Sequence, residues 1–337
     1  MIKGIHYTDV HLQATNPPSR LGDYSQDILD KMRRIGSLAS EYAVDFTTCG
    51  GDLYHRKSPR ETPHWLVSET MGVLRSYPSR NFAIPGNHDV QFDRDDTLPE
   101  QPLNVLFRSG ALTRQVDQVL SDGKGLSVQM HGFSFSEEPD FSSMVLKDPG
   151  AADFHILSLH IYASPRGGKL HEMKLHSYGE IASLGYDLVL MGHYHADQGI
   201  STLPGPRGDC RIVNIGSLSR GDYGDENLNR VPKCCLISVS RDTSGSVLCD
   251  LEEIPVGARP ASEVFDLEKK AEIKKHTAQT VEFVAELRKV ADDTAVHSGL
   301  STDEAIASLG VSDASVIQTI GDYMEKARVM LEEGRRK

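Results

Sequence analysis

Short apolar runs alternate with polar, turn-forming residues over most of the chain. The runs occupy residues 2–7, 44–49, 81–85, 128–135, 154–160, 187–191, 211–215, 234–240 and 246–254. Each run ends near Gly, Asp, Asn, Pro or His, which is typical of β-strands bounded by loops. Apolar side chains at near-helical spacing predict helices over residues 24–42 and 63–76. We therefore expect an α/β fold in which two mixed sheets pack face to face between outer helices.

The pattern changes after Pro255. From residue 263 to about 290, apolar side chains recur at helical intervals among Lys and Glu, and no strand signal returns. A further amphipathic pattern continues toward the end of the chain. We predict two units, a large α/β domain over residues 1–258 and a helical C-terminal segment over residues 259–337.

Composition and charge narrow the class of protein. The chain has 337 residues, 39% hydrophobic and 25% charged, and no run approaches the ~20 apolar residues of a membrane span. The first thirty residues contain no signal-peptide core, so we expect a cytoplasmic protein with no membrane partner. Five cysteines without a CxxC pair indicate reduced, buried thiols. A formal charge of −12 argues against a surface that binds nucleic acid unaided.

Four segments place metal-binding side chains directly after predicted strands. They are Asp9-Val-His11, Gly51-Asp52-Leu-Tyr-His55, Gly86-Asn87-His88-Asp89 and Gly192-His193-Tyr-His195. Carboxylate and amide oxygens mixed with imidazole suit divalent Mn, Fe or Zn rather than Ca or a structural, Cys-bound Zn. In Asp9-x-His11 and His193-x-His195, a two-residue spacing on extended backbone would point both side chains the same way. Glycines before Asp52, Asn87 and His193 allow sharp turns close to the ions.

The order of these segments and the Gly-Asn-His-Asp tetrad resemble the calcineurin-like metallophosphoesterase family over roughly residues 1–255. The resemblance implies a four-layer α-β-β-α sandwich. It also implies one more ligand between the tetrad and Gly192-His193. His160, at the end of the predicted strand 154–160, is the favoured residue. The alternatives are His155, His171 and His176.

The resemblance further implies two divalent ions. Asp9, His11, Asp52 and His195 would hold one ion, and Asp52, Asn87, His160 and His193 would hold the other. A water or hydroxide shared between the ions would then attack phosphorus in line. The resemblance favours Mn²⁺, with Fe²⁺, Zn²⁺ and Mg²⁺ as alternatives.

Two residues beside ligand Asn87 are candidates for catalysis. His88 is expected to protonate the leaving oxygen or to stabilise its charge. Asp89 would either fix the tautomer of the His88 imidazole or simply cap the loop.

Two further features resemble the SbcD-type subunits of double-strand-break repair nucleases. One is His55 in Gly-Gly-Asp-Leu-Tyr-His, and the other is the stretch Asn214-Ile-Gly-Ser-Leu-Ser-Arg-Gly-Asp-Tyr-Gly-Asp-Glu-Asn. The resemblance implies that His55 helps to hold a phosphodiester. It implies a DNA exonuclease with single-strand endonuclease activity, in repair, recombination or replication. It also implies an SMC-like ATPase partner, bound through the C-terminal helices. The short C-terminal part suits a phage or minimal version.

Local positive charge near the expected site comes from residues 56–64, Arg166 and Lys169. Two alternatives to a nuclease stay open. The acidic composition favours a stand-alone phosphodiesterase or phosphatase acting on a small nucleotide. A non-catalytic scaffold could instead retain a vestigial site and bind its partner through the C-terminal helices, which could also cap DNA or form a homodimer.

Overall fold

The computed structural model describes residues 1–275, except residues 59, 171–172, 222–223 and 273. The chain divides into two compact units, Met1–Phe265 and Asp266–Lys337. The first unit extends past residue 258, where the sequence places the boundary, because Val264 and Phe265 are buried in it. The helices expected beyond residue 275 lie outside the described residues. Among the described residues, none of the helices is long and apolar enough to cross a bilayer.

The first sheet has the strand order β15-β14-β1-β2-β3-β4. Its strands are β1 (Ile2–Tyr7), β2 (Phe46–Cys49), β3 (Arg80–Ala83), β4 (Thr113–Arg114), β14 (Lys233–Arg241) and β15 (Val247–Pro255). Strands β1 to β4 pair in parallel, while β14 and β15 are antiparallel to their neighbours. The register aligns Tyr7, Cys49 and Ala83, so the loops after three parallel strands start at one edge of the sheet.

The second sheet has the order β12-β13-β11-β7-β6-β5. Its strands are β5 (Asp117–Ser121), β6 (Ser127–Phe133), β7 (Phe154–His160), β11 (Leu188–Gly192), β12 (Gly199–Gly205) and β13 (Gly208–Asn214). The four inner strands are parallel, and His160 pairs with Gly192 at the ends of β7 and β11. A small third sheet contains β8 (Ala163–Ser164), β9 (Gly168–Leu170) and β10 (Met173–Ser177).

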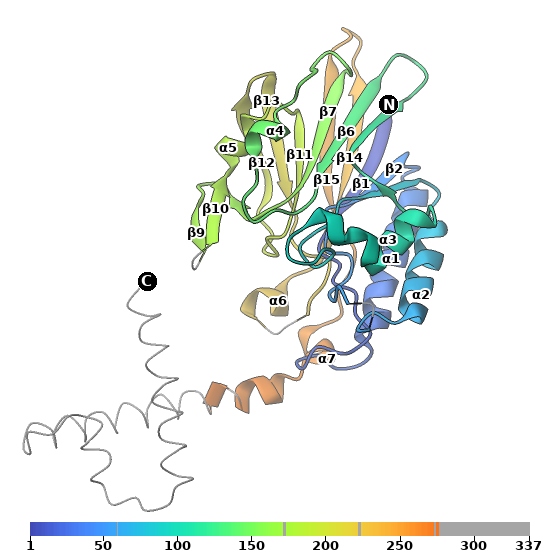
Figure 1. Cartoon of the computed structure of the whole chain (residues 1–337), viewed down its shortest axis with the longest axis vertical. Helices are drawn as coiled ribbons and strands as arrows, with labels where there is room; N and C mark the ends of the chain where they lie inside the picture. Colours follow the sequence, from blue (N-terminus) through green and yellow to red (C-terminus); the bar gives the residue numbers. More distant parts are fainter. Residues whose placement is uncertain (59, 171–172, 222–223, 273, 276–337) are drawn as a thin grey trace, which may run out of the picture. The chain divides into compact units, whose positions relative to one another are not determined.

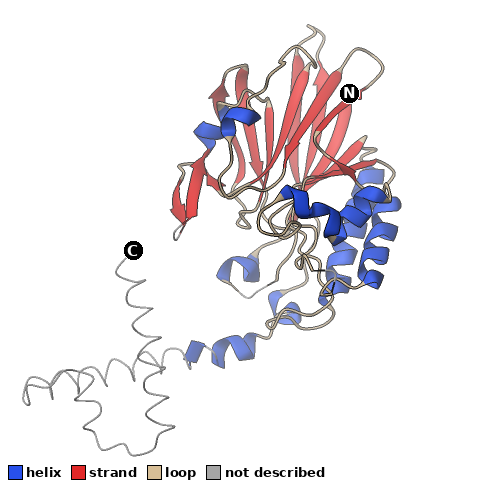
Figure 2. Cartoon of the chain, viewed as in Figure 1, coloured by secondary structure: helices blue, strands red, loops and turns tan. Residues whose placement is uncertain are grey.

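Helices cover the outer face of each sheet (Figures 1 and 2). Helices α1 (Tyr24–Glu41), α2 (His64–Arg75) and α3 (Pro102–Arg108), with the 3-10 helix η1 (Asp95–Glu100), flank the first sheet, and α4 (Phe141–Met144) and α5 (Tyr178–Ala182) flank the second. The short helices α6 (Asp225–Asn229) and α7 (Ala261–Val264) lie in later loops. Asp23 caps the N-terminus of α1, where its side chain accepts a 3.0 Å hydrogen bond from the Gln26 backbone N–H.

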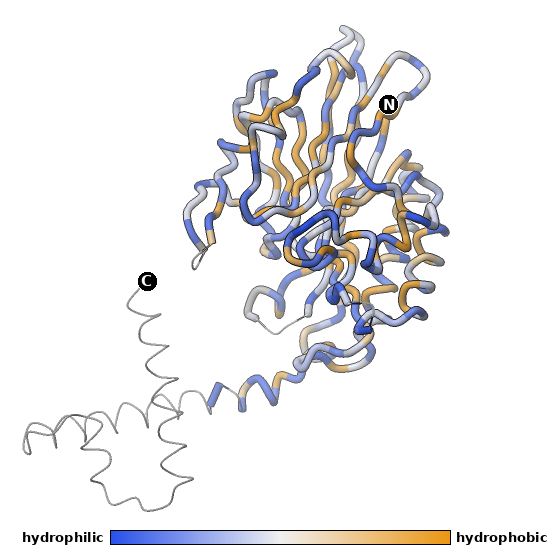
Figure 3. Tube along the Cα trace, in the orientation of Figure 1, coloured by the Kyte–Doolittle hydropathy of each residue, from blue (hydrophilic) through white to orange (hydrophobic). Residues whose placement is uncertain are grey.

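Three apolar clusters separate these layers. The first joins α1 and α2 to one face of the first sheet, the second lies between the sheets, and the third lies under α5. Successive residues of β7 belong to different clusters. Ile156 faces the first sheet and lies in the second cluster, while Leu157 packs with Ile181 of α5 in the third. Figure 3 shows the resulting concentration of apolar residues along the strands. The four-layer α-β-β-α sandwich expected from the sequence is confirmed.

Candidate metal centre and catalytic cleft

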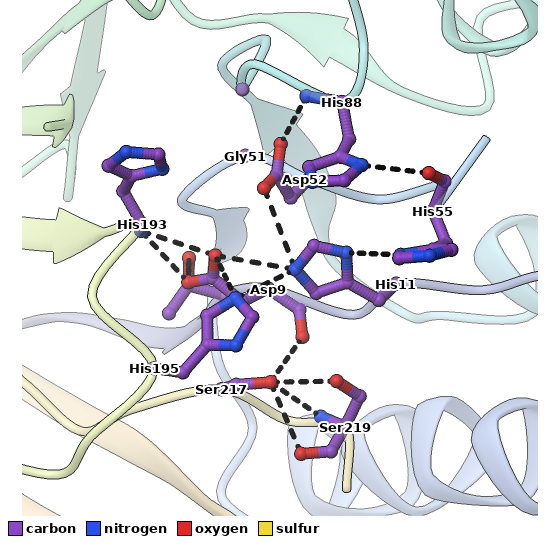
Figure 4. A network of polar contacts seen from close by, with 12 residues as sticks. Asp9, His11, Gly51, Asp52, His55, His88, His193, His195, Ser217 and Ser219 are labelled. Atoms are coloured by element: carbon purple, nitrogen blue, oxygen red, sulfur yellow. Dashed lines mark hydrogen bonds and ion pairs between the residues drawn. The ribbon is translucent and has the colours of Figure 1, made fainter. Parts of the chain in front are cut away.

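The predicted metal-binding residues come from the carboxyl ends of five parallel strands. Asp9 and His11 follow β1, Asp52 follows β2 and Asn87 follows β3. His160 ends β7, and His193 and His195 follow β11. Because parallel strands end at one edge of each sheet, and both sheets present this edge on the same side, the loops converge (Figure 4).

The backbone at this convergence is left-handed rather than extended. Asp9 (φ 52°), His11 (φ 47°), Asp52 (φ 53°) and His193 (φ 84°) all have positive φ. The expectation that extended backbone aligns Asp9 with His11 and His193 with His195 is therefore wrong. Non-glycine residues with positive φ are strained and cluster at functional sites. In these turns the side chains point toward the common centre, and they do not alternate between two faces as the side chains of a strand do.

One group of side chains contains Asp52, Asn87, His160 and His193. His160 Nε2 lies 3.2 Å from Asp52 Oδ2 and 3.1 Å from Asn87 Oδ1. His160 Nδ1 lies 2.7 Å from the Gly50 carbonyl oxygen, which can only accept, so Nδ1 carries a proton and Nε2 is the nitrogen that faces Asp52 and Asn87. Ligand atoms of Asp52, His160 and His193 all lie within 4.8 Å of one another. The group matches the donor set of a divalent-ion site.

A second group contains Asp9, His11 and His195, whose ligand atoms also lie within 4.8 Å of one another. His11 Nε2 is 2.9 Å from His195 Nε2 and 3.5 Å from Asp52 Oδ2. Asp9 and Asp52 are buried, whereas the side chain of His195 is 48% exposed and borders solvent. Asp52 thus faces both groups, as a residue shared by two ions must.

Burial sets the protonation of these imidazoles. It lowers the pKa of His193 to about 2 and that of His11 well below its usual range. Both rings are therefore neutral at pH 7, the form in which histidine binds metal. Burial also disfavours charge on His160, but the Asp52 carboxylate outweighs it and raises the pKa of His160 to about 9. Among the described residues, the buried Nε2 of His193 has no hydrogen-bond partner. The site thus favours a positive charge beside Asp52 and leaves an imidazole nitrogen available, which fits a cation centre.

Two glycines permit the close approach of the loops. A Cβ at Gly51, where φ is +105°, would lie 2.4 Å from His160 Nδ1. A Cβ at Gly86 would lie 2.1 Å from Asp52 Oδ1. Any larger residue would displace a candidate ligand, which is why both loops carry glycine here.

A hydroxyl-rich set of contacts holds Asp9 (Figure 4). The Thr8 hydroxyl donates to Asp9 Oδ2 at 2.7 Å, and the Ser217 hydroxyl donates to the Asp9 carbonyl at 2.8 Å. The Ser219 backbone N–H donates to the same carbonyl at 3.3 Å. The sequence singles out the Ser217–Ser219 stretch only by family resemblance, and it gives no signal for Thr8.

His55 and His88 form a pair of imidazoles beside His11. His55 Nδ1 lies 3.2 Å from His11 Nδ1, and the rings of His55 and His88 stack with centroids 5.0 Å apart. His88 Nδ1 lies 2.8 Å from the His55 carbonyl oxygen, so this carbonyl fixes the His88 tautomer. Burial, and then the charge of His88, lower the pKa of His55 to about 4.

The His55 carbonyl, rather than Asp89, holds His88 Nδ1, so the expected role of Asp89 in fixing the tautomer is wrong. The Asp89 carboxylate accepts hydrogen bonds from the backbone N–H groups of Gly86 (3.0 Å), Leu53 (3.3 Å) and Tyr54 (3.4 Å). Asp89 therefore ties the loop after β3 to the loop after β2. This is the loop-capping alternative that the sequence also allowed.

Other candidates lie away from the centre. His155 opens β7 and stacks on His131, and His176 in β10 packs on Phe141. His171 lies outside the described residues. Of the basic residues, Arg56 lines the cleft of about 300 Å³ together with His11, His55, His88 and His195. Arg166 and Lys169 are exposed and do not line it.

Aromatic rings that the sequence did not single out pack on the group of Asp52, Asn87, His160 and His193. Tyr162, just after β7, places its ring centroid 3.7 Å from that of His193. Phe135, after β6, lies 5.0 Å from His193 and 6.1 Å from His160. These rings restrict the imidazoles to the observed orientation.

The chain is similar to several known proteins. One relative, the DNA double-strand break repair protein Mre11 of Archaeoglobus fulgidus, is 33% identical over 90 residues, or 26% of this chain and 19% of that protein. Two solved structures, one of them TT1561 of Thermus thermophilus, cover 75% and 76% of this chain and 98% and 99% of their own, with TM-scores of 0.41 and identities of 12% and 14%. A family model for calcineurin-like phosphoesterases matches residues 2–197, more than half of the chain. The chain belongs to the calcineurin-like phosphoesterase family, whose members hydrolyse phosphoesters and use a dinuclear site for divalent metal ions.

Proposed function

We propose that the chain is a metal-dependent DNA nuclease, an exonuclease with single-strand endonuclease activity. The observation that carries this proposal is the position of His55. It lies outside the two groups described above and forms a third cluster with His11 and His88, whose ligand atoms lie within 4.8 Å of one another. Its Nδ1 is 3.2 Å from His11 Nδ1, and its ring stacks on His88. A neutral imidazole there can hydrogen-bond the second esterified oxygen of a phosphodiester without adding charge.

We assign the metal ligands as the family pattern implies. Asp9, His11, Asp52 and His195 would hold one ion, and Asp52, Asn87, His160 and His193 would hold the other. When bound, such a pair supplies an activated water and neutralises the phosphoryl oxygens, and Mn²⁺ is the ion we favour. The chain itself orients these ligands through the Gly50 carbonyl, Thr8 and Ser217.

His88 is the candidate general acid. Its Nδ1 is occupied by the His55 carbonyl at 2.8 Å, so Nε2 is the nitrogen that can deliver a proton to the leaving oxygen. His55 Nδ1 faces the imidazole of His11 rather than a carbonyl, so its tautomer is not fixed in the same way. We assign His55 to holding the diester.

Two observations support DNA as the substrate. The relative from Archaeoglobus fulgidus is a DNA double-strand break repair protein by name. Arg56 places one cation in the cleft next to His55. The net charge of −12 opposes unaided binding of DNA. We therefore propose that an SMC-like ATPase, bound through residues 259–337, contributes DNA contacts.

The second candidate is a phosphodiesterase or phosphatase acting on a small nucleotide. The cleft volume of about 300 Å³ and the acidic charge favour it. It needs neither Arg56 nor a partner.

The test compares two substrates with Mn²⁺ present: single-stranded DNA and a generic nitrophenyl phosphodiester. We expect His55→Ala to reduce DNA cleavage by about 100-fold, the lower end of the loss for one hydrogen-bond donor to the reacting group, and to reduce hydrolysis of the generic diester too, because both substrates carry a second esterified oxygen. His64→Ala is the matched control, because His64 is an exposed histidine that begins α2.

Hydrolysis of the generic diester alone, with His55→Ala inconsequential, would favour the small-nucleotide enzyme. A purified chain without bound metal and without activity in Mn²⁺ would instead favour a vestigial site.

A further inference from the structure

A second cavity of about 390 Å³ lies beside α1, and no step of the proposed hydrolysis uses it. Its lining is Arg20, Asp27, Asp30, Lys31, Arg220, Val256, Gly257, Ala258, Arg259 and Val264. None of these residues lines the catalytic cleft. Residues of the loop before α1 and of the loop after β13 line both hollows, and the Ser19 hydroxyl joins the two loops by donating to the Gly221 carbonyl at 3.1 Å.

Positive charge is in excess around this cavity. Four cations line it, from Arg20, Lys31, Arg220 and Arg259. Asp27 is shared, since Arg20 and Arg259 both form ion pairs with it. The other carboxylate, Asp30, is 62% exposed and pairs with Arg33 at 2.7 Å. One carboxylate therefore faces four cations, two of which, Arg20 and Arg220, are over 90% buried.

Hydrogen-bond donors of residues that line the cavity also lack acceptors. Arg20 is 8% exposed, and its buried Nε has no hydrogen-bond partner among the described residues. Lys31 Nζ has three hydrogens, and the part of the chain that the structure describes supplies one acceptor, the Leu218 carbonyl at 3.0 Å. Arg20 Nε is enclosed by protein and does not reach the cavity, but Lys31 is half-buried, and an anion in the cavity can accept its remaining hydrogens.

Arg220 differs from its neighbours in the cavity. Its guanidinium donates to the carbonyls of Asn227 (2.6 Å), Arg259 (2.8 Å) and Leu228 (2.9 Å). These bonds hold the loop after β13 in place. Arg220 therefore contributes charge to the cavity, and Arg20, Lys31 and Arg259 contribute the donors.

Neighbouring charges also act on Lys31. Burial, and then the cations of Arg20, Arg230 and Arg220, lower the pKa of Lys31 to about 7, against the opposing charge of Asp27. An anion in the cavity would reverse this effect.

We propose that this cavity binds a phosphate group, either free phosphate or the phosphate of a small metabolite, through Lys31, Arg20 and Arg259. A phosphate accepts several charge-assisted hydrogen bonds at once, which matches three converging cationic donors. The volume lies at the lower end of the ~300–1,000 Å³ range of small-ligand pockets. A nucleic-acid strand would instead need a groove that follows its backbone.

The test is the number of phosphates bound per full-length, Mn²⁺-loaded chain, measured by equilibrium dialysis with labelled inorganic phosphate. The proposed metal centre would also bind phosphate, so the readout is the difference between variants. We expect Lys31→Met to bind one phosphate fewer than the wild type. Arg34→Gln, which removes a cation of α1 paired with Glu41, is the matched control and should keep the full number.

Arg259→Gln is a second test that does not depend on whether the Lys31 variant folds. The Arg259 side chain is 47% exposed, so we expect its replacement to leave the fold intact. We expect it to weaken the second phosphate by about tenfold, the loss of one charge-assisted contact. Tighter binding of adenosine monophosphate than of phosphate to this site would identify a phosphorylated metabolite, and equal binding would identify free phosphate. Unchanged numbers of bound phosphate and unchanged affinity in both variants would overturn the proposal.

Discussion

Gly51→Ala tests whether the fold of the loop after β2 sets the position of His160. Gly51 has φ +105°, and a Cβ there would lie 2.4 Å from His160 Nδ1 and 3.1 Å from Gly86 Cα. His160 is fully buried, and its Nδ1 donates to the Gly50 carbonyl at 2.7 Å. The ring cannot move aside freely, because His193 and Phe135 pack on it with centroids 4.8 Å and 6.1 Å away.

The expected loss of stability has two parts. Holding alanine in left-handed backbone costs ~1–2 kcal/mol. Displacing the ring leaves the buried Gly50 carbonyl or the imidazole N–H without its partner, at ~1–3 kcal/mol. We therefore expect the free energy of unfolding to fall by about 2–5 kcal/mol, a large share of the ~5–15 kcal/mol of a typical domain. Mn²⁺ affinity should fall by ~10–100-fold, as for other residues that orient a metal-binding histidine.

Urea unfolding and calorimetric titration with Mn²⁺ measure the two effects. Gly110→Ala is the matched control for strain alone, because Gly110 has φ +72° and a Cβ there would meet nothing within 4 Å. Gly72→Ala, in the exposed part of α2, controls for the substitution itself and should be neutral or stabilising. The reasoning is refuted if Gly51→Ala loses no more stability than Gly110→Ala and binds Mn²⁺ as tightly as the wild type.

Three other predictions follow from buried polar contacts. Thr8→Val removes the 2.7 Å hydrogen bond to Asp9 Oδ2 at nearly constant volume, so Mn²⁺ affinity should fall by about tenfold in calorimetry, and an unchanged affinity would contradict the role of Thr8. Arg220→Met removes three bonds to carbonyls and should cost about 3 kcal/mol in urea unfolding, at ~1 kcal/mol for each bond, whereas Arg34→Gln should cost less than ~0.5 kcal/mol. For Lys31, the native pKa of about 7 is below the usual 10.5, so the unfolded chain binds more protons between these values and wild-type stability rises with pH there, by up to ~1.4 kcal/mol per unit. The stability advantage of Lys31→Met in phosphate-free buffer should therefore be largest below pH 7 and shrink as pH rises toward the usual pKa of 10.5, and a constant difference would refute the lowered pKa.

The sequence alone determined the layers of the fold, because each inner strand is an apolar run that ends in a turn. β7, for example, was predicted at the bounds the structure has, since all seven of its residues are buried. The edge strands β5 and β12 were missed. β5 has one fully buried residue and β12 has none, so both carry a weak apolar signal, and β12 also contains Pro204, which argues against a strand in sequence.

The sequence also indicated which side chains meet at the centre. Residues that follow parallel strands must emerge at one edge, so Asp9, Asp52 and Asn87 could be grouped from strand order alone. His160 was separated from His155 by the same argument, and the structure places them at opposite ends of β7.

Only the tertiary structure decided how these side chains are held. Asp9 and His193 adopt left-handed backbone that the strand pattern does not predict. The His55 carbonyl on His88 and the contacts of Asp89 with Leu53 and Tyr54 join segments far apart in the chain. The cavity beside α1 depends in the same way on Arg20, Lys31 and Arg259, which are separated by up to 239 positions in sequence and share no motif. Periodicity reports which face of an element is buried, but it carries no information on which distant charge or carbonyl will lie opposite a given side chain. That pairing is set by how the layers pack, and here it determines both the centre and the cavity.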